Sequence, residues 1–228
     1  MIPTWNEVEN ITYLIKDIKK VLEGVKYEII IVDRHSQDGT AKLARDLGAK
    51  VIYDDKGKGS ALIKGFKEAK GDIIVSMDAD LSNRASELKM LIAAIESGYD
   101  VCMGSRYLLG GGSNDMPLYR RIANKILVDI VNILYRSHYS DLCYGFRSFS
   151  KEALKKLDLK EEGFGIETEI NIKAQKAHLK IIEIPSLEKK RENGEAKLHA
   201  FRDGYIIIKT IFKNYFAPEQ KGSKKLSN

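Results

Sequence analysis

The sequence predicts an α/β fold in which a mostly parallel sheet is covered by helices on both faces. Two observations carry this prediction. Short apolar segments alternate with helix-like segments through the first half of the chain. These strand-like segments are apolar throughout, which is typical of strands buried on both faces. The composition, 43% hydrophobic and 31% charged over 228 residues, agrees with a globular domain of this kind.

Each predicted strand is an apolar run, rich in β-branched residues, that ends in polar residues. The predicted strands cover 27–33, 49–55, 72–78, 100–106 and 180–188. The segments between the first four have apolar residues at helical spacing and stop at a glycine. These predicted helices cover 40–48, 60–71 and 86–98. The alternation favours β-α-β units and therefore a parallel sheet.

The second half of the chain is richer in long amphipathic segments. Apolar residues recur at helical spacing over 118–136, and a final amphipathic stretch covers 199–216. We expect residues 1–216 to form a single domain that ends in amphipathic helices. The polar tail, 217–228, is expected to be disordered.

Charge and cysteine content exclude some classes of protein. The net charge of +6 and the sequence pI of about 9.1 fit an anionic partner, such as a nucleotide, a phospholipid or a nucleic acid, without choosing among them. Cys102 and Cys143 do not form a CxxC pair, so no zinc site is indicated. No apolar run reaches the roughly 18 residues that a membrane span needs. Nucleic-acid binding is disfavoured because the basic residues form no stripe interleaved with aromatic residues.

Two carboxylates follow the predicted strand 72–78, at the edge of the sheet where open α/β folds bind ligands. Asp78 and Asp80 are separated by one alanine, and Asp33 and Arg106 end neighbouring strands. Carboxylate oxygens suit Mg²⁺ or Mn²⁺, an ion that is often shared with substrate phosphates. The alternative is a solvated acidic turn, but the position after an apolar strand favours a cation site.

Two further patterns could bind anions. The segment "KGKGSA", 56–61, places glycines before a predicted helix, although the Walker pattern and GxGxxG are both absent. A plain tight turn is the alternative. Several arginines would lie at the carboxyl edge of the sheet, where they could bind an anion through paired hydrogen bonds, and Arg106 is the best placed of them.

Taken together, these residues resemble a family 2 glycosyltransferase of the GT-A fold, a Rossmann-like architecture. The dolichyl-phosphate mannose synthases and their polyprenyl-phosphate relatives are the branch that the chain is most similar to. The matching motifs, in chain order, are "IPTWNEVENI", "VDRHSQDGT", "KGKGSAL", "MDADLS", "GSRYLLGGG", "DLCYGFRSF" and "KKRENGEAKL". Any one of these motifs is weak, but seven in the right order and spacing are a strong indication.

The resemblance implies an inverting transfer of a hexose from a nucleotide-diphosphate sugar, of the GDP-mannose or UDP-glucose type, to a polyprenyl (dolichyl) phosphate. Residues 1–106 would form the nucleotide-sugar half and 107–216 the acceptor half. The nucleotide-sugar would be held by Pro3, Trp5, Glu7, Asp33, Asp78, Ala79, Asp80, Arg191 and Lys197. The metal, Mg²⁺ or Mn²⁺, would be held by Asp78, Asp80 and Ser82.

The acceptor determines which side chains the chemistry needs. Arg106 and Arg120 would face an acceptor phosphate, whose oxygen is already anionic, so no strong general base is required. A hydroxyl acceptor would need a base, for which Asp141 is the candidate, with Glu167 behind it. Both carboxylates could instead be partners of nearby arginines. The catalytic set is therefore predicted to be Asp80, Arg106 and Asp141.

Three rival interpretations remain open at this point. The first is a soluble family 2 transferase that acts on a sugar or protein hydroxyl. The second is an inactive binding module of the same fold, which the intact Asp78 and Asp80 disfavour. The third is a nucleotidyltransferase, whose glycine-rich N-terminal signature is missing.

The chain departs from the family pattern at several positions. Arg34 stands where the family has a second aspartate, Ser82 is smaller than the usual ligand, and Ala196 replaces a loop serine. These changes put the sugar and the nucleotide in doubt more than the reaction type. Only Met1 and Ile2 precede "PTWNE", so the usual first strand is expected to be missing. We hypothesise that the natural start lies roughly eight residues upstream, the length of a strand.

A lipid acceptor would require contact with a membrane surface. Two segments could supply it: 118–136, and 201–216 with Lys209 and Lys213 among aromatic residues. The alternative is that both pack on the core. We expect a cytoplasmic protein that can associate with the cytoplasmic face of a membrane.

Overall fold

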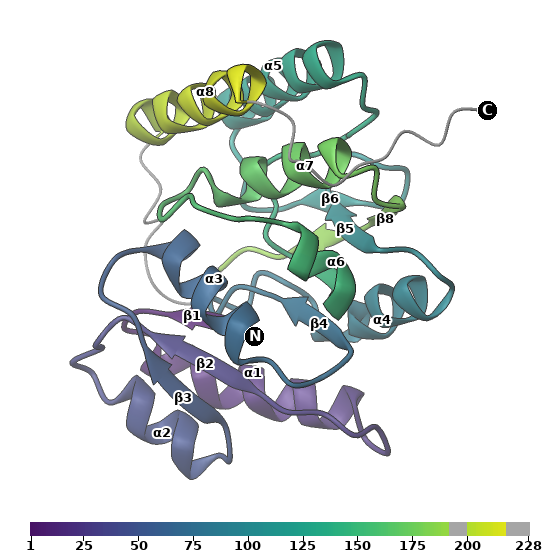
Figure 1. Cartoon of the computed structure of the whole chain (residues 1–228). Helices are drawn as coiled ribbons and strands as arrows, with labels where there is room; N and C mark the ends of the chain where they lie inside the picture. Colours follow the sequence, from purple (N-terminus) through teal and green to yellow (C-terminus); the bar gives the residue numbers. More distant parts are fainter. Residues whose placement is uncertain (192–199, 218–228) are drawn as a thin grey trace.

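The computed structural model describes residues 1–191 and 200–217. Its strands form two larger sheets that lie side by side (Figure 1). The first sheet is fully parallel and has the order β1 (Ile2–Thr4), β2 (Ile30–Asp33), β3 (Lys50–Tyr53). The second has the order β4 (Ile73–Ser76), β7 (Arg147–Ser150), β5 (Val101–Ser105), β8 (Ile181–Pro185).

The short first strand joins the two sheets. The Met1 amine donates to the Val75 carbonyl at 2.7 Å, and the Met77 amide donates to the Met1 carbonyl at 3.2 Å. These bonds place β1 beside β4, so the sheets continue into one another. The expectation that this strand is missing is wrong, because Ile2–Thr4 is enough to pair with β2.

Helices cover both faces of the first sheet, as predicted. Ile31 of β2 packs with the apolar side of one helix, α1, whereas Val32 packs with Ala61 of another, α3, on the opposite face. The helices are α1 (Val8–Val21), α2 (Thr40–Asp46), α3 (Lys58–Glu68), α4 (Leu88–Glu96), α5 (Leu118–Tyr135), α6 (Lys151–Lys156), α7 (Ile166–Lys176) and α8 (Ala200–Phe216). A short 3₁₀ helix, Ala85–Glu87, precedes α4. The predicted α/β fold is therefore confirmed.

The second sheet contains one strand that the sequence pattern did not predict. β7 runs antiparallel to both neighbours, β4 and β5. Its residues are mostly buried, yet Arg147 and Ser148 are polar. Because the segment has neither an apolar run nor an alternating pattern, strand periodicity could not reveal it.

The two longest C-terminal helices pack against one another at one end of the molecule. In Figure 1, α5 and α8 lie together above α7. The Tyr135 hydroxyl of α5 donates to the Ile211 carbonyl of α8 at 2.6 Å. Within residues 1–191 and 200–217, no helix is long and apolar enough to cross a membrane. The predicted disordered tail lies outside the described residues, except for Ala217.

Candidate active site

A cavity of about 640 Å³ opens at the carboxyl ends of the strands. It brings together residues from both halves of the chain, and most of the predicted site residues line it. These are Pro3, Trp5, Glu7, Asp78, Ala79, Asp80, Arg106, Arg120 and Arg191. Three predicted residues, Asp33, Ser82 and Asp141, lie behind the cavity wall. Lys197 lies outside the described part of the chain.

Asp80 is held by the serine that follows it two positions later. Asp80 Oδ1 accepts hydrogen bonds from the Ser82 amide at 3.1 Å and from Ser82 Oγ at 2.6 Å. Leu81, between them, has a left-handed backbone with φ of 62°, an uncommon conformation for a side chain of its size. Ser82 is 4% exposed and points at Asp80 rather than into the cavity. We therefore reassign Ser82 from metal ligand to positioning residue.

Asp78 is paired with a lysine that the sequence did not single out. Lys58 Nζ lies 2.8 Å from Asp78 Oδ1 and 2.8 Å from Glu167 Oε1. Burial alone would lower the pKa of Lys58, but these two carboxylates more than offset it, so its pKa is raised and the lysine stays charged. Asp78 therefore has an ion-pair partner at 2.8 Å, which it shares with Glu167, whereas Asp80 has Arg191 at the longer distance of 3.5 Å.

The carboxylates present fit a divalent cation that is shared with a substrate. Among the described residues, no group of three acidic, histidine or cysteine side chains could hold a metal by itself. Mg²⁺ and Mn²⁺ are commonly bound through one or two carboxylates, while substrate phosphates and water supply the remaining oxygens. Asp80 and Asp78, on one wall of a large cavity, match that pattern.

Asp33 has a structural role that the strand-end position did not reveal. Its carboxylate is 0% exposed and accepts hydrogen bonds from Thr4 Oγ1 at 3.0 Å and from Ser36 Oγ at 2.6 Å. These bonds fix the loop after β2 against β1. The next residue, Arg34, lines the cavity instead, with its guanidinium 4.9 Å from the centre of the Trp5 ring. Arg34 and Trp5, rather than Asp33, therefore form the wall at this end.

Arg106 is committed to two carboxylates. Its Nε and Nη2 donate to Asp141 at 2.7 and 2.9 Å, and its Nη1 lies 3.2 Å from Glu188. Burial by itself would lower the pKa of Arg106, but Asp141 and Glu188 outweigh it and the pKa is raised. The Asp141 side chain is 0% exposed, so a substrate cannot reach the carboxylate proposed as a base. Asp141 is an arginine partner here, the alternative that the sequence had left open.

Two other arginines line the cavity, Arg120 of the predicted acceptor set and Arg191 of the predicted nucleotide-sugar set. Arg120, in the first turn of α5, lines the cavity beside Tyr119. Arg191 Nε donates to Asp115 at 3.0 Å and lies 3.5 Å from Asp80 Oδ2. The predicted diphosphate arginine thus lies next to the predicted metal ligand.

The glycines of "KGKGSA" allow close packing of two backbones. A Cβ on Gly59 would lie 2.1 Å from the Glu161 carbonyl oxygen, and the Ser60 amide donates to the Glu162 carbonyl at 3.1 Å. The segment 161–163 therefore covers the start of α3. This packing places Lys58 between Asp78 and Glu167, so the motif contributes a half-buried lysine to the cavity.

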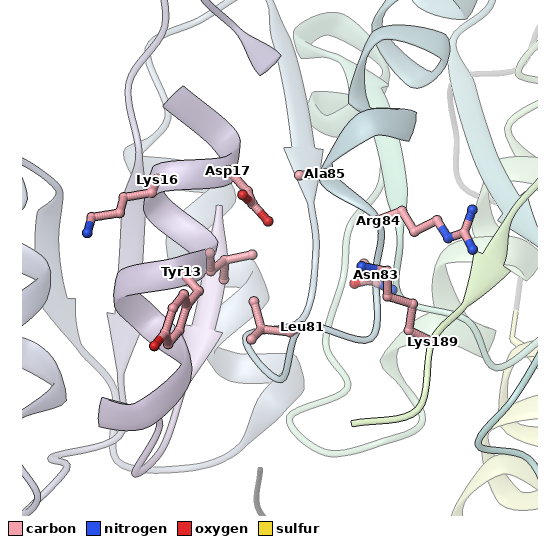
Figure 2. Close-up of a pocket in the computed structure, with 9 residues that line it drawn as sticks. Tyr13, Lys16, Asp17, Leu81, Asn83, Arg84, Ala85 and Lys189 are labelled. Atoms are coloured by element: carbon pink, nitrogen blue, oxygen red, sulfur yellow. The ribbon is translucent and has the colours of Figure 1, made fainter. Parts of the chain in front are cut away.

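A second cavity, of about 230 Å³, lies between α1 and the loop after β4. Figure 2 shows that Leu81 and Tyr13 face each other there, while the charged ends of Lys16 and Arg84 point in different directions. Because these side chains do not converge on one point, the cavity is not a second candidate site.

Comparison with known proteins identifies the family of the chain. The family model of Glycosyl transferase family 2 matches residues 1–158. The dolichol-phosphate mannosyltransferase of Pyrococcus furiosus is 39% identical over 221 residues, which cover 93% of this chain and 60% of that protein. The polyprenol monophosphomannose synthase of Mycolicibacterium smegmatis is 30% identical, over 93% of this chain and 83% of that protein. The chain thus spans less than two thirds of the Pyrococcus furiosus relative.

The solved structures add a likeness in fold. Glucosyl-3-phosphoglycerate synthase from Mycobacterium tuberculosis, in complex with Mn²⁺, UDP and glucosyl-3-phosphoglycerate, superposes with a TM-score of 0.76 at 20% identity. The match covers 96% of this chain and 80% of that one. The predicted GT-A architecture is therefore confirmed, and the match of the family model over residues 1–158 shows that the chain belongs to glycosyl transferase family 2.

Proposed function

We propose that the chain is an inverting glycosyltransferase that moves a hexose from a nucleotide-diphosphate sugar to a polyprenyl phosphate. The observation that carries this proposal is the composition of the 640 Å³ cavity. This cavity is lined by Asp78 and Asp80, which suit a cation, and by Arg120 and Arg191, which suit phosphate groups. Residues of the amphipathic helices α5 and α8 line it as well. Residues 1–106 supply the aspartates and residues 107–216 supply the helices, in agreement with a donor half and an acceptor half.

The leaving group sets the first requirement of the reaction. Transfer passes through an oxocarbenium-like state while a nucleoside diphosphate departs. Mg²⁺ or Mn²⁺ bound by Asp80 and Asp78 would neutralise charge on that diphosphate. Ser82 orients the Asp80 carboxylate, and Lys58 holds Asp78 in place. Arg191 is close enough to Asp80 to contact the same diphosphate.

The state of the carboxylates favours an acceptor that is already anionic. A hydroxyl acceptor needs a general base, yet Asp141 is bound to Arg106 and Glu167 is paired with Lys58. A phosphate oxygen needs no base, only positioning by cationic groups. Arg120, in the first turn of α5, supplies such a group, whereas the charge of Arg106 is balanced by Asp141 and Glu188.

The faces of α5 and α8 support contact with a lipid surface. Apolar residues on both helices are exposed in stripes at helical spacing, which is how interfacial helices present themselves. They include Tyr119, Ile122, Ile126 and Ile133 of α5, and Tyr205, Ile208, Phe212 and Tyr215 of α8. The cavity is lined by the same two helices, so a prenyl chain in the bilayer surface could present its phosphate to Arg120.

The proposal is tested by supplying GDP- and UDP-sugars in turn, with Mn²⁺ and polyprenyl phosphate, and following lipid-linked product. We expect one nucleotide-sugar, of the GDP-mannose or UDP-glucose type, to give product. Asp80→Asn, which keeps the size of the side chain but removes its charge, should abolish turnover. A chain that forms no lipid-linked product with any nucleotide-sugar would refute the proposed function.

A further inference from the structure

We propose that Asp115 is a positioning residue for Asp80, on which it acts through Arg191. The inference rests on the metal site of the proposed function and assigns a role to a third carboxylate beside it. Asp115 lies in the loop before α5, and its carboxylate lines the same cavity as Asp80. No motif of the sequence singled it out.

The starting point is the way the two oxygens of Asp80 are used. Oδ1 is engaged by the amide and the hydroxyl of Ser82. Oδ2 is 3.5 Å from Nε of Arg191. A divalent cation that coordinates Oδ2 must therefore share that oxygen with the guanidinium, and two positive charges around one carboxylate oxygen repel each other.

Asp115 offers Arg191 a better partner than Asp80 does. Arg191 Nε donates to Asp115 Oδ2 at 3.0 Å, which is 0.5 Å shorter than its distance to Asp80. The three side chains are only 18–24% exposed, so their charges are screened less than those of a surface pair. With Asp115 present, the guanidinium can withdraw from Asp80 without losing its counter-charge.

The backbone holds Asp115 at this place. A short strand, β6 (Gly112–Ser113), runs parallel to β9 (Leu187–Glu188), and the Asn114 amide donates to the Glu188 carbonyl at 3.0 Å. The Lys189 amide donates to the Ser82 carbonyl at 2.9 Å. These bonds tie the segments that carry Asp115, Arg191 and Asp80 to one another.

This arrangement has a defined consequence for cation binding. Without the Asp115 charge, Arg191 would pair more closely with Asp80 and compete more strongly with a metal ion. Without Arg191, Asp80 Oδ2 would be open to the metal and Asp115 would no longer matter. The influence of Asp115 on the metal should therefore depend on Arg191.

The test measures binding of Mn²⁺ alone to the full chain, by the electron paramagnetic resonance of free Mn²⁺. Asp115→Asn should raise the dissociation constant roughly fivefold, and Arg191→Gln should lower it by a similar factor. Adding Asp115→Asn to Arg191→Gln should change the constant by less than about twofold. Asp129→Asn is the matched control, because Asp129 pairs with Lys125 on the exposed side of α5 and should leave the constant unchanged.

Several results would overturn the inference. An equal effect of Asp115→Asn with and without Arg191 would mean that Asp115 acts only by its own charge. The inference is also refuted if Asp115→Asn leaves the Mn²⁺ dissociation constant unchanged. It is likewise refuted if neither the native chain nor Arg191→Gln binds Mn²⁺ saturably. The Mn²⁺ binding assay does not depend on transferase activity. If the variants show the predicted changes in Mn²⁺ binding but the chain forms no lipid-linked product, only the proposed function is refuted. If the chain forms product but the predicted changes in Mn²⁺ binding are not seen, only this inference is refuted.

Discussion

Small polar side chains determine how the acidic residues of the site are presented. Asp33 ends β2, and Asp78 and Asp80 follow β4, yet only the last two reach the cavity. Asp33 is turned inward by Thr4 and Ser36, while Asp80 is turned outward and fixed by Ser82. For Asp33 and Asp80, neighbouring hydroxyl groups therefore fix the direction of the carboxylate, whereas Asp78 is held by Lys58.

Removing the Ser82 hydroxyl should loosen the metal ligand without removing it. Hydrogen bonds to a charged group contribute about 1.5–3 kcal/mol, so Ser82→Ala should raise the Mn²⁺ concentration for half-maximal transfer about tenfold. Ser97→Ala is the control, since Ser97 Oγ bonds only to a helix carbonyl at an exposed end of α4. An unchanged Mn²⁺ dependence in Ser82→Ala would contradict the positioning role.

Arg147 is the most consequential buried charge outside the cavity. It is 1% exposed, and its guanidinium donates to the carbonyls of Tyr144, Leu142 and Glu167 and to Asn171 Oδ1, at 2.6–3.2 Å. Burial lowers its pKa. The side chain thereby joins the loop before β7 to α7, which carries Glu167.

A lysine cannot reproduce this set of bonds, because its three donors leave from one atom. Arg147→Lys should therefore lower the free energy of unfolding by about 3 kcal/mol, measured by urea denaturation. Arg45→Lys, an exchange at an exposed arginine that bonds to Tyr53, should change it by less than about 0.5 kcal/mol. If both exchanges lower the free energy of unfolding by the same small amount, the hydrogen bonds of the Arg147 guanidinium are not needed for stability.

A close backbone contact between α3 and the segment 161–163 helps to assemble the site. The start of α3 is pressed against 161–163, and this contact carries Lys58 into the cavity. Gly59→Ala would force the two backbones apart, so we expect a loss of roughly 1–3 kcal/mol of stability. Gly163→Ala is the matched control in the same contact, because its Cβ would meet nothing within 4 Å. Equal midpoints of thermal unfolding for these two variants would refute the packing argument.

The paired helices α5 and α8 should determine binding to lipid surfaces. The double variant Ile126→Glu/Phe212→Glu places charge in both exposed stripes, and should abolish sedimentation with anionic liposomes at low salt. Val25→Glu, at a residue that is 50% exposed near the end of α1, should bind as the native chain does. If the double variant sediments with liposomes as the native chain does, α5 and α8 do not form the membrane interface.

Part of the fold could be predicted from the sequence. Apolar runs and glycine stops indicated β2, β3, β4 and β5 and the helices between them, because burial on both faces leaves a strong pattern. They missed β7, whose strand carries a buried arginine. The strand-end position of Asp33 and the family resemblance of Ser82 and Asp141 also placed these residues in the site, but neither shows the direction of a side chain. Lys58, Asp115 and Glu188 were missed because only the fold brings them to their partners, which are Asp78, Arg191 and Arg106 in that order.

For the whole molecule, the cavity depends on distant segments meeting at one edge. The N-terminal segment supplies Trp5, the loop after β4 supplies Asp78 and Asp80, and α5 supplies Arg120. The two candidate bases, Asp141 and Glu167, are paired with the side chains of Arg106 and Lys58. We therefore propose an acceptor that needs no deprotonation. A lipid phosphate meets this requirement, and a lipid alcohol does not.

The most direct test compares polyprenyl phosphate with the matching polyprenol as acceptor, using the nucleotide-sugar that the chain accepts and Mn²⁺. We predict lipid-linked product with the phosphate and at least about a thousandfold less with the alcohol, because Asp141 and Glu167 are paired with Arg106 and Lys58 and would not give general-base assistance, typically about 10²–10⁴-fold. Comparable rates with the two acceptors would contradict this prediction, because a side chain of the cavity would then have to act as the base.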